Sequence, residues 1–270
     1  MILLQASQEG SGMGALLMFA VTMVFLLSLV LTRKFNLGIY LPGVPVPLRR
    51  ERKAILKKYF SYYVKLPPEK QKIFEYRVQR FLHQKEFIPR QMKEVREDMK
   101  VLIAACAVQL TFGFPNVALS YFTRILVYPN DYYSTISKKY HRGEVNPRLK
   151  AIVLSWRHFV DGYLDEKDGR NLGLHEMAHA LRIENLIRNN EFGFLDDNIQ
   201  QQWRIHAGEE IEKIKSGVST FFRAYAATDF EEFFAVAVEN FFERPEAFQQ
   251  ELPQLYTLLA LLLHQDPLRP

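Results

Sequence analysis

The hydrophobic pattern of the chain begins with one long uncharged run. Met13 to Leu31 holds no charged residue, and a helix of that length can cross a bilayer core of about 30 Å. Arg33 and Lys34 follow at once, which favours a cytoplasmic location for the rest of the chain. A signal peptide is the alternative, but no Lys or Arg precedes the run. We therefore predict a short tail over 1–12, a transmembrane helix over 13–32, and a single-pass protein of the inner (cytoplasmic) membrane.

After this run the chain changes to a linker and then to a pattern typical of a folded domain. Residues 33–48 contain three prolines and two glycines, as an extended linker does. Residues 49–270 are long enough to bury a sizeable core, and we predict that they form one domain. Apolar spacing, helix-starting prolines and N-cap residues predict helices over Glu51–Val64, Pro68–His83, Pro89–Leu110, Asn198–Lys215, Asp229–Phe242 and Pro245–His264.

Two short runs differ from the helical pattern because they are rich in β-branched residues. Arg124–Tyr128 and Ala151–Ser155 are predicted to be strands, with a hairpin or loop between them. Trp156–Leu164 fits a short helix or a loop. The fold class expected from these patterns is α+β and α-rich, with a small sheet.

Charge and cysteine content narrow the possible partners. Residues 33–100 carry 18 Lys and Arg against 7 Asp and Glu, a balance of +11, whereas the remainder carries 17 against 23, a balance of −6. Because the basic part directly follows the apolar run, it favours an anionic membrane surface over nucleic acid. The one cysteine, Cys106, excludes an internal disulfide and a Cys-rich zinc module, so a metal would need His and carboxylate ligands.

The candidate chemistry lies in an apolar stretch around His175 and His179. Residues four apart on a helix differ by about 40° around its axis, so both imidazoles project from one face. Glu176 lies between them, where its carboxylate can take a proton from a metal-bound water. A structural His pair is the alternative, but the apolar neighbours are those of a helix packed in a core. Asn171 is the expected N-cap of this helix.

A catalytic zinc site needs one more protein ligand. The position six residues after His179 is Asn185, which excludes a third His there. The carboxylates left as candidates are Glu184, Glu231, Glu232, Glu239 and Glu243. Glu232 and Glu239 share one face of a helix that is apolar almost all round, where an unpaired acid would cost several kcal/mol. For Glu231 and Glu243 we expect a solvated helix edge.

Several blocks in order resemble the zinc-dependent peptidases related to Mlc titration factor A. The blocks are His175–His179, Tyr225–Ala227, Glu232–Val236, Glu239–Phe242 and the upstream Ile152–Trp156. The similarity covers roughly Phe114 to Phe248, and this ordered combination is far more specific than the two histidines alone. The resemblance implies a zincin-like metallopeptidase domain over 49–270.

The resemblance also implies a set of site residues. One Zn²⁺ per chain would be bound by His175, His179 and Glu232. Glu176 would be the general base, and Tyr225 would steady the oxyanion. Glu239 would then hydrogen-bond a ligand or a neighbouring helix.

The expected function is hydrolysis of peptide bonds in a peptide or protein substrate by a membrane-anchored enzyme, with its catalytic domain in the cytoplasm. A substrate strand would pair with an edge strand at Arg124–Tyr128. The alternative function is binding, because the family's name refers to sequestering a transcriptional repressor. In that case the chain would hold such a partner at the membrane with little proteolysis. Residues 13–32 would contact the lipid bilayer, and we expect no nucleic-acid partner.

Overall fold

The structure, a computed structural model, covers two units that are described separately. It describes residues 14–27, 47–115, 117–134, 138–188 and 193–269. The units are Met1–Val46 and Pro47–Pro270. The predicted tail over 1–12 lies outside the described residues, as does the predicted linker over 33–48 except for its last two positions. The domain boundaries at 12, 32 and 48 therefore stay predictions.

The predicted membrane-spanning helix is wrong. Within the predicted span of 13–32, the structure describes residues 14–27, which form a helix. Position 13 and positions 28–32 lie outside the described residues. Among the helices that the structure describes, none is both long and apolar enough to cross a membrane. The absence of charge was a correct observation, but it did not establish a span of sufficient length, so the single-pass location inferred from it is withdrawn as well.

The second unit is built on a four-stranded sheet in the order β1-β2-β6-β5. Its strands are β1 (Glu86–Pro89), β2 (Arg124–Tyr128), β6 (Ala151–Ser155) and β5 (Gly143–Asn146). The first three are parallel, and β5 runs antiparallel to β6. The two predicted strands have the predicted bounds, but β2 is an inner strand. It therefore cannot accept a substrate strand, and the free edges belong to β1 and β5.

A separate hairpin and a cluster of helices accompany this sheet. The hairpin is formed by β3 (Tyr132–Ser134) and β4 (Lys139–His141). The helices before β2 are α2 (Arg50–Tyr59), α3 (Ser61–Lys65), α4 (Pro68–Gln84) and α5 (Glu97–Thr111). The apolar helix α5 is almost wholly buried and packs against α2 and α4. The helix predicted over Glu51–Val64 is split at Phe60 into α2 and α3. The helix predicted to begin at Pro89 begins eight residues later, at Glu97, because Pro89 ends β1 and Gln91 has a left-handed backbone.

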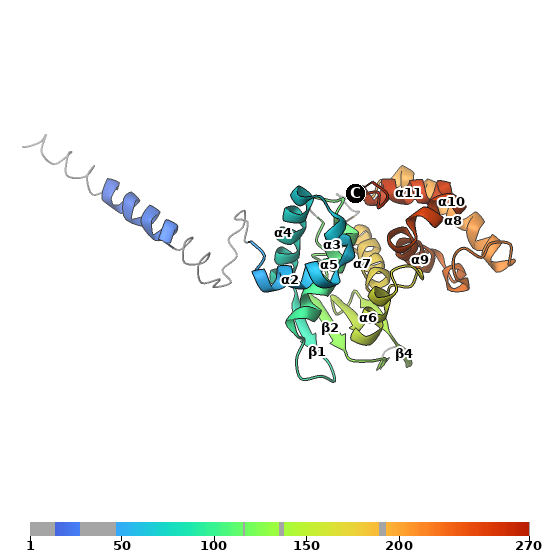
Figure 1. Ribbon diagram of the computed structural model, residues 1–270, viewed down its shortest axis with the longest axis horizontal. Coiled ribbons are helices and arrows are strands. Elements are labelled where there is room, and N and C mark those ends of the chain that lie inside the picture. Colours follow the sequence, from blue (N-terminus) through green and yellow to red (C-terminus); the bar gives the residue numbers. More distant parts are fainter. Residues whose placement is uncertain (1–13, 28–46, 116, 135–137, 189–192, 270) are drawn as a thin grey trace, which may run out of the picture. The chain divides into compact units, whose positions relative to one another are not determined.

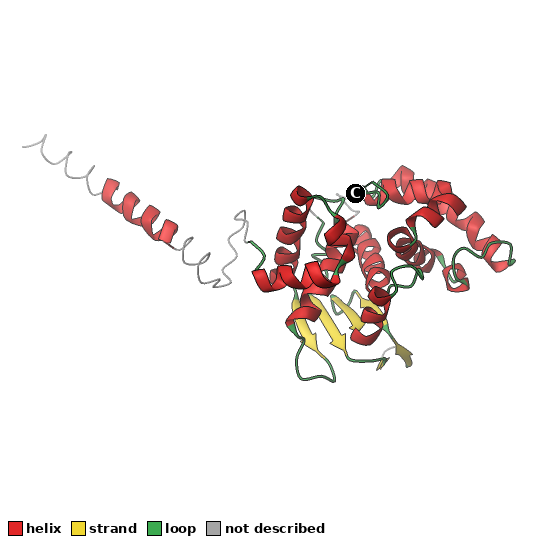
Figure 2. Cartoon of the chain, in the orientation of Figure 1, coloured by secondary structure: helices red, strands yellow, loops and turns green. Residues whose placement is uncertain are grey.

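Helix α7 (Leu172–Arg188) connects the sheet to the C-terminal helices. It contacts β5 and β6 of the sheet, α5 among the N-terminal helices, and α9 (Phe230–Glu243). The short helix α6 (Trp156–Leu164) precedes it (Figure 1). Figure 2 shows the strands on one side of the unit and the helices gathered on the other. The chain's candidate site residues lie mainly on α7 and α9, so the packing of these two helices defines the site.

The C-terminal helices surround α9. They are α8 (Asp197–Lys215), the 3-10 turn η1 (Ala224–Ala227), α10 (Pro245–Glu251) and α11 (Pro253–Leu263). Each of them contacts α9. The predicted final helix is interrupted at Leu252, because Pro253 cannot continue a helix and instead begins the next one. Helix α9 is accordingly buried along most of its length.

Candidate metal centre

Helix α7 begins where the sequence predicted and brings the two histidines together. Asn171 is its N-cap, with Oδ1 accepting the backbone N–H of Leu174 at 3.0 Å. One turn later His175 is buried, and a further turn on His179 is partly buried. Their Nε2 atoms lie 3.1 Å apart. Two imidazole nitrogens therefore point at one small volume on the face of α7 that meets α9.

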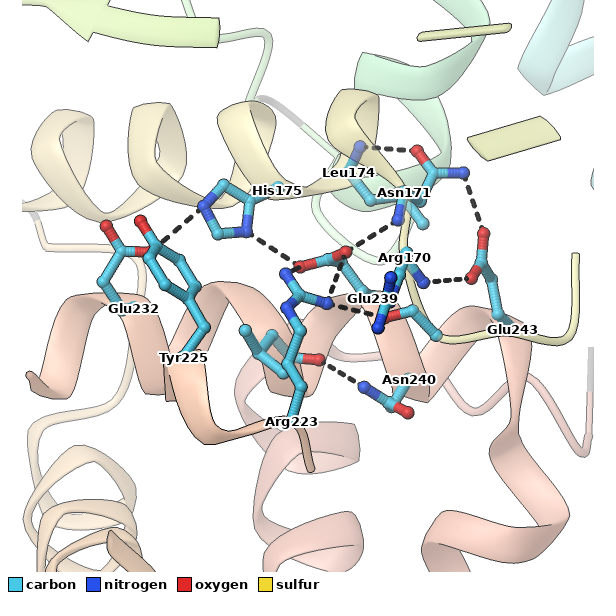
Figure 3. A network of polar contacts seen from close by, with 12 residues as sticks. Arg170, Asn171, Leu174, His175, Arg223, Tyr225, Glu232, Glu239, Asn240 and Glu243 are labelled. Atoms are coloured by element: carbon cyan, nitrogen blue, oxygen red, sulfur yellow. Dashed lines mark hydrogen bonds and ion pairs between the residues drawn. The ribbon is translucent and has the colours of Figure 1, made fainter. Parts of the chain in front are cut away.

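Helix α9 brings Glu232 to the same volume. Asp229 caps α9 by accepting the N–H groups of Glu231 and Glu232, which fixes the first turn. Oε2 of Glu232 lies 3.1 Å from Nε2 of His175 and 3.6 Å from Nε2 of His179. Figure 3 shows Glu232 facing His175. This oxygen is buried, and both imidazole nitrogens lie close to it. Three lone-pair atoms thus converge from two helices.

The distances among these atoms fit a zinc ion. Zinc bonds of about 2.0–2.1 Å in a tetrahedron separate the ligand atoms from one another by about 3.3–3.4 Å. The three distances here, 3.1, 3.1 and 3.6 Å, bracket that range. His175, His179 and Glu232 are the set of described His, Cys, Asp and Glu side chains that could hold a metal together. A donor set of two imidazoles and one carboxylate is typical of catalytic zinc in proteins.

The other nitrogen of His175 is held by Glu239. Its Nδ1 lies 2.8 Å from Oε1 of Glu239, a residue whose side chain is only 2% exposed. Burial alone would lower the pKa of His175, but the hydrogen bonds to Glu232 and Glu239 outweigh it and raise the pKa to about 10. A carboxylate behind a ligating imidazole fixes its ring orientation and increases its basicity. The contact expected for Glu239 is therefore present.

Glu176 is buried beside the histidines and faces the sheet. It is 5% exposed, and burial raises its pKa to about 7 against the opposing effect of His175 and His179. The edge strand β5 passes so close that a Cβ at Gly143 would overlap the Glu176 carboxylate. The first residue of β5 thus has to be glycine for this carboxylate to keep its place.

Tyr225 stands on η1 at the margin of the site. Its side chain is about half exposed, and its ring centre is 6.1 Å from that of His175. Burial and the nearby Glu232 carboxylate raise the pKa of Tyr225 to about 12, so its hydroxyl keeps its proton at neutral pH. It is therefore available as a hydrogen-bond donor.

A cleft of about 680 Å³ opens onto these residues. His175, Glu176 and Tyr225 line it together with Gly143 of the edge strand. Residues of β4 and α6 form its other walls. The buried carboxylate of Glu176, the half-exposed Tyr225 and the edge strand β5 thus border one open volume.

The remaining acidic candidates lie elsewhere and have other partners. Glu184 accepts the N–H groups of Ser120 and Tyr121, and Glu231 pairs with Arg182. Glu243 accepts the N–H of Arg170 and the amide of Asn171, and it is only partly buried. The predicted solvated edge thus describes Glu243 poorly, although neither Glu231 nor Glu243 reaches the histidines.

The sequence interpretation missed Arg223. Its guanidinium donates to both oxygens of Glu239, at 2.6 and 3.1 Å, and to the carbonyl of Gly169 at 2.8 Å. One signal could have indicated it. A buried acid in an apolar helix requires a cation or several donors nearby, and Arg223 is the Arg closest in sequence before Glu239.

Comparison with known proteins identifies the family of this chain. The chain belongs to the glucose-regulated metallo-peptidase M90 family, whose model matches residues 44–264. Proteins called Mlc titration factor A from Escherichia coli O7:K1 (strain IAI39 / ExPEC) and O127:H6 (strain E2348/69 / EPEC) are 32% and 31% identical over 211 residues, covering 71% of this chain and 77% of theirs. An uncharacterised protein of Synechocystis sp. is 28% identical over 237 residues, 82% of this chain and 86% of its own. The predicted resemblance is confirmed.

Proposed function

We propose that this protein is a zinc-dependent peptidase that binds one Zn²⁺ per chain through His175, His179 and Glu232. The observation that carries the proposal is the convergence of their three lone-pair atoms within 3.6 Å of one another. A largely buried carboxylate oxygen beside two imidazole nitrogens is stabilised by a cation at that point, and a bound zinc ion would supply it. Membership of a metallopeptidase family supports the same assignment.

The chain's own groups divide the chemistry of peptide hydrolysis among them. Bound zinc would supply Lewis acidity and lower the pKa of water to about 7. Glu176 accepts the proton of the attacking water and returns it to the leaving amine, a dual role suited to a pKa of about 7. Tyr225 donates its hydroxyl proton in a hydrogen bond to the oxygen of the attacked carbonyl. Both groups face the same cleft.

The strand edge at β5 is the proposed location of the substrate backbone. It borders the cleft at Gly143, next to Glu176, whereas the inner strand β2 has no free edge. An extended peptide can hydrogen-bond to such an edge and become an added strand. Its scissile carbonyl would then lie beside the buried carboxylate.

Zinc content and hydrolysis test this proposal on the full chain. The purified protein should hold about one zinc per chain, and His179→Ala should lose it. The control is His206→Ala, because His206 lies on α8 away from the cluster, and this variant should keep its zinc. Equal zinc in all three proteins, or none in the unmodified chain, contradicts the ligand set. Hydrolysis of a peptide library by the zinc-loaded chain tests the activity separately.

A second candidate function is partner binding. It rests on two relatives whose name, Mlc titration factor A, describes the titration of Mlc. This chain would then sequester a protein of that kind with little proteolysis. Capture of a purified partner by Glu176→Gln, together with no hydrolysis by the unmodified zinc-bound chain, would favour binding. Loss of capture in the same variant would count against it.

A further inference from the structure

Arg223 lies behind the proposed ligand His175 and does not contact it directly. The residue precedes η1, and its guanidinium meets Glu239 with two nearly parallel hydrogen bonds (Figure 3). Oε1 of Glu239 is shared, because it contacts Nη2 of Arg223 at 2.6 Å and Nδ1 of His175 at 2.8 Å. Arg223, Glu239 and His175 therefore form one continuous chain of hydrogen bonds.

The second oxygen of Glu239, Oε2, also has two hydrogen-bond partners. It accepts the backbone N–H of Asn171 at 2.7 Å and Nη1 of Arg223 at 3.1 Å. The guanidinium also donates to the carbonyl of Gly169, so it joins the segment before α7 to α9. A planar fork of this kind leaves a carboxylate few other orientations.

Without Arg223, the buried Glu239 carboxylate would keep the backbone N–H of Asn171 and the imidazole of His175 as hydrogen-bond partners among the described residues. A carboxylate that is 2% exposed either takes up a proton or moves when its cation is removed. In both cases the ring of His175 loses the acceptor that sets its orientation. Tyr225 lies two residues after Arg223 on η1, so the position of η1 would also lose the support of the Arg223 hydrogen bonds.

We propose that Arg223 is a positioning residue of the metal centre, which fixes His175 through Glu239 and anchors the segment that carries Tyr225. This inference rests on the proposed function. Arg223 contributes no ligand atom. It determines how well the ligand ring and the tyrosine hydroxyl are aligned before a metal or a substrate binds.

A second Arg–Glu pair provides a matched control. Arg182 of α7 donates to both oxygens of Glu231 on α9, at 3.0 and 3.2 Å, and its side chain is 8% exposed. The chemistry is the same and the pair also connects α7 to α9, but the described partners of His175 are Glu239, His179 and Glu232, not Arg182 or Glu231. Loss of this pair therefore reports what general loosening of the helices does to the site.

The experiment compares Arg223→Met with Arg182→Met in the full chain. The first readout is zinc affinity, measured by competition with a chromophoric chelator, and the second is the thermal midpoint of the metal-free protein. Arg223→Met should weaken zinc binding by about 10- to 100-fold. Arg182→Met should change it by less than about threefold at a similar loss of thermal stability. Millimolar guanidinium ion should restore zinc affinity in Arg223→Met alone.

Unchanged zinc affinity in Arg223→Met, or equal losses in both variants, overturns the positioning role. Absence of zinc from the unmodified chain refutes the proposed function instead. If Arg223→Met does not fold, Arg223→Lys and Arg182→Lys replace the pair. Lysine keeps the charge without the fork, so a smaller loss confined to Arg223→Lys supports the role, and no difference overturns it.

Discussion

Both halves of helix α7 contain polar residues inside the protein, but these residues have different partners. In the N-terminal half, His175 and His179 meet Glu232 with their lone pairs directed at one another. In the C-terminal half, Glu184 is fully buried and accepts backbone N–H groups of Ser120 and Tyr121. The N-terminal half thus gathers titratable side chains at one point, whereas the C-terminal half holds its buried carboxylate with backbone N–H groups.

This difference separates a reactive site from a structural one on a single helix. Backbone N–H groups do not change their charge with pH. A carboxylate that accepts its hydrogen bonds from them therefore connects two segments of the chain permanently. Asn185 behaves in the same way, since its Oδ1 accepts the N–H groups of Phe194 and Leu195. Burial of a carboxylate is therefore a poor indicator of chemistry unless its neighbours are themselves titratable.

The largest effect should come from Glu176→Gln in the N-terminal half. Glutamine keeps the shape but cannot accept a proton, so the rate constant kcat should fall by about 10²- to 10⁴-fold. Zinc content should not change, because Glu176 supplies no proposed ligand. Peptide cleavage under saturating substrate is the measurement. Full activity in this variant would remove Glu176 from the mechanism.

A smaller loss is expected from Gly143→Ala, which alters the neighbour of Glu176 and not the carboxylate itself. The added methyl group would overlap that carboxylate, and a misplacement of about 1 Å can cost about 10²-fold in rate. Gly208→Ala on α8 is the control, because its Cβ would meet Phe230 at 3.6 Å, an ordinary contact. If both variants hydrolyse peptides equally well, the strand β5 does not position the base.

A substitution in the C-terminal half of α7 should lower the stability of the protein without changing zinc binding. Glu184→Gln weakens hydrogen bonds to a buried charge, so the free energy of unfolding should fall by about 2 kcal/mol. Zinc affinity should stay within about threefold of the original. Denaturant titration and chelator competition on the same samples measure the two quantities. A large change in zinc affinity would erase the distinction between the two halves.

The last expected effect is a pH dependence at the N-terminal end of α7. Burial raises the pKa of Glu243 to about 8, against its hydrogen bond from Asn171 and with support from Glu239 and Asp168. The folded chain then binds more protons than the unfolded chain between the ordinary value of 4.5 and about 8. Its free energy of unfolding should fall across that window as pH rises. Glu243→Gln should flatten the slope there, and an unchanged slope would contradict the assignment.

Much of the site could be predicted from the sequence because its determinants are local. The spacing of His175 and His179 and the N-cap Asn171 are features of one helix, and the structure reproduces both. The third ligand was harder, because sequence spacing does not show which face of α9 meets α7. The resemblance to relatives selected Glu232. Arg223 was missed because its contact with Glu239 depends on the path of the chain before η1.

The errors in the fold prediction have equally specific causes. Strand β1 is only four residues long and ends in Pro89, which is tolerated there because β1 is an edge strand. The predicted membrane helix was inferred from the absence of charge, a property that does not determine where a helix ends. Among the described helices none is both long and apolar enough to cross a membrane.

The proposed ligands are separated by more than fifty residues, since Glu232 follows His179 only after the whole of α8. A polypeptide still attached to the ribosome would expose both imidazoles well before the glutamate is translated. Under the proposed ligand set, such a nascent chain has two of its three ligands and cannot yet form a competent enzyme. Under this proposal, a newly made copy could not hydrolyse neighbouring proteins until its final third has been synthesised and has folded.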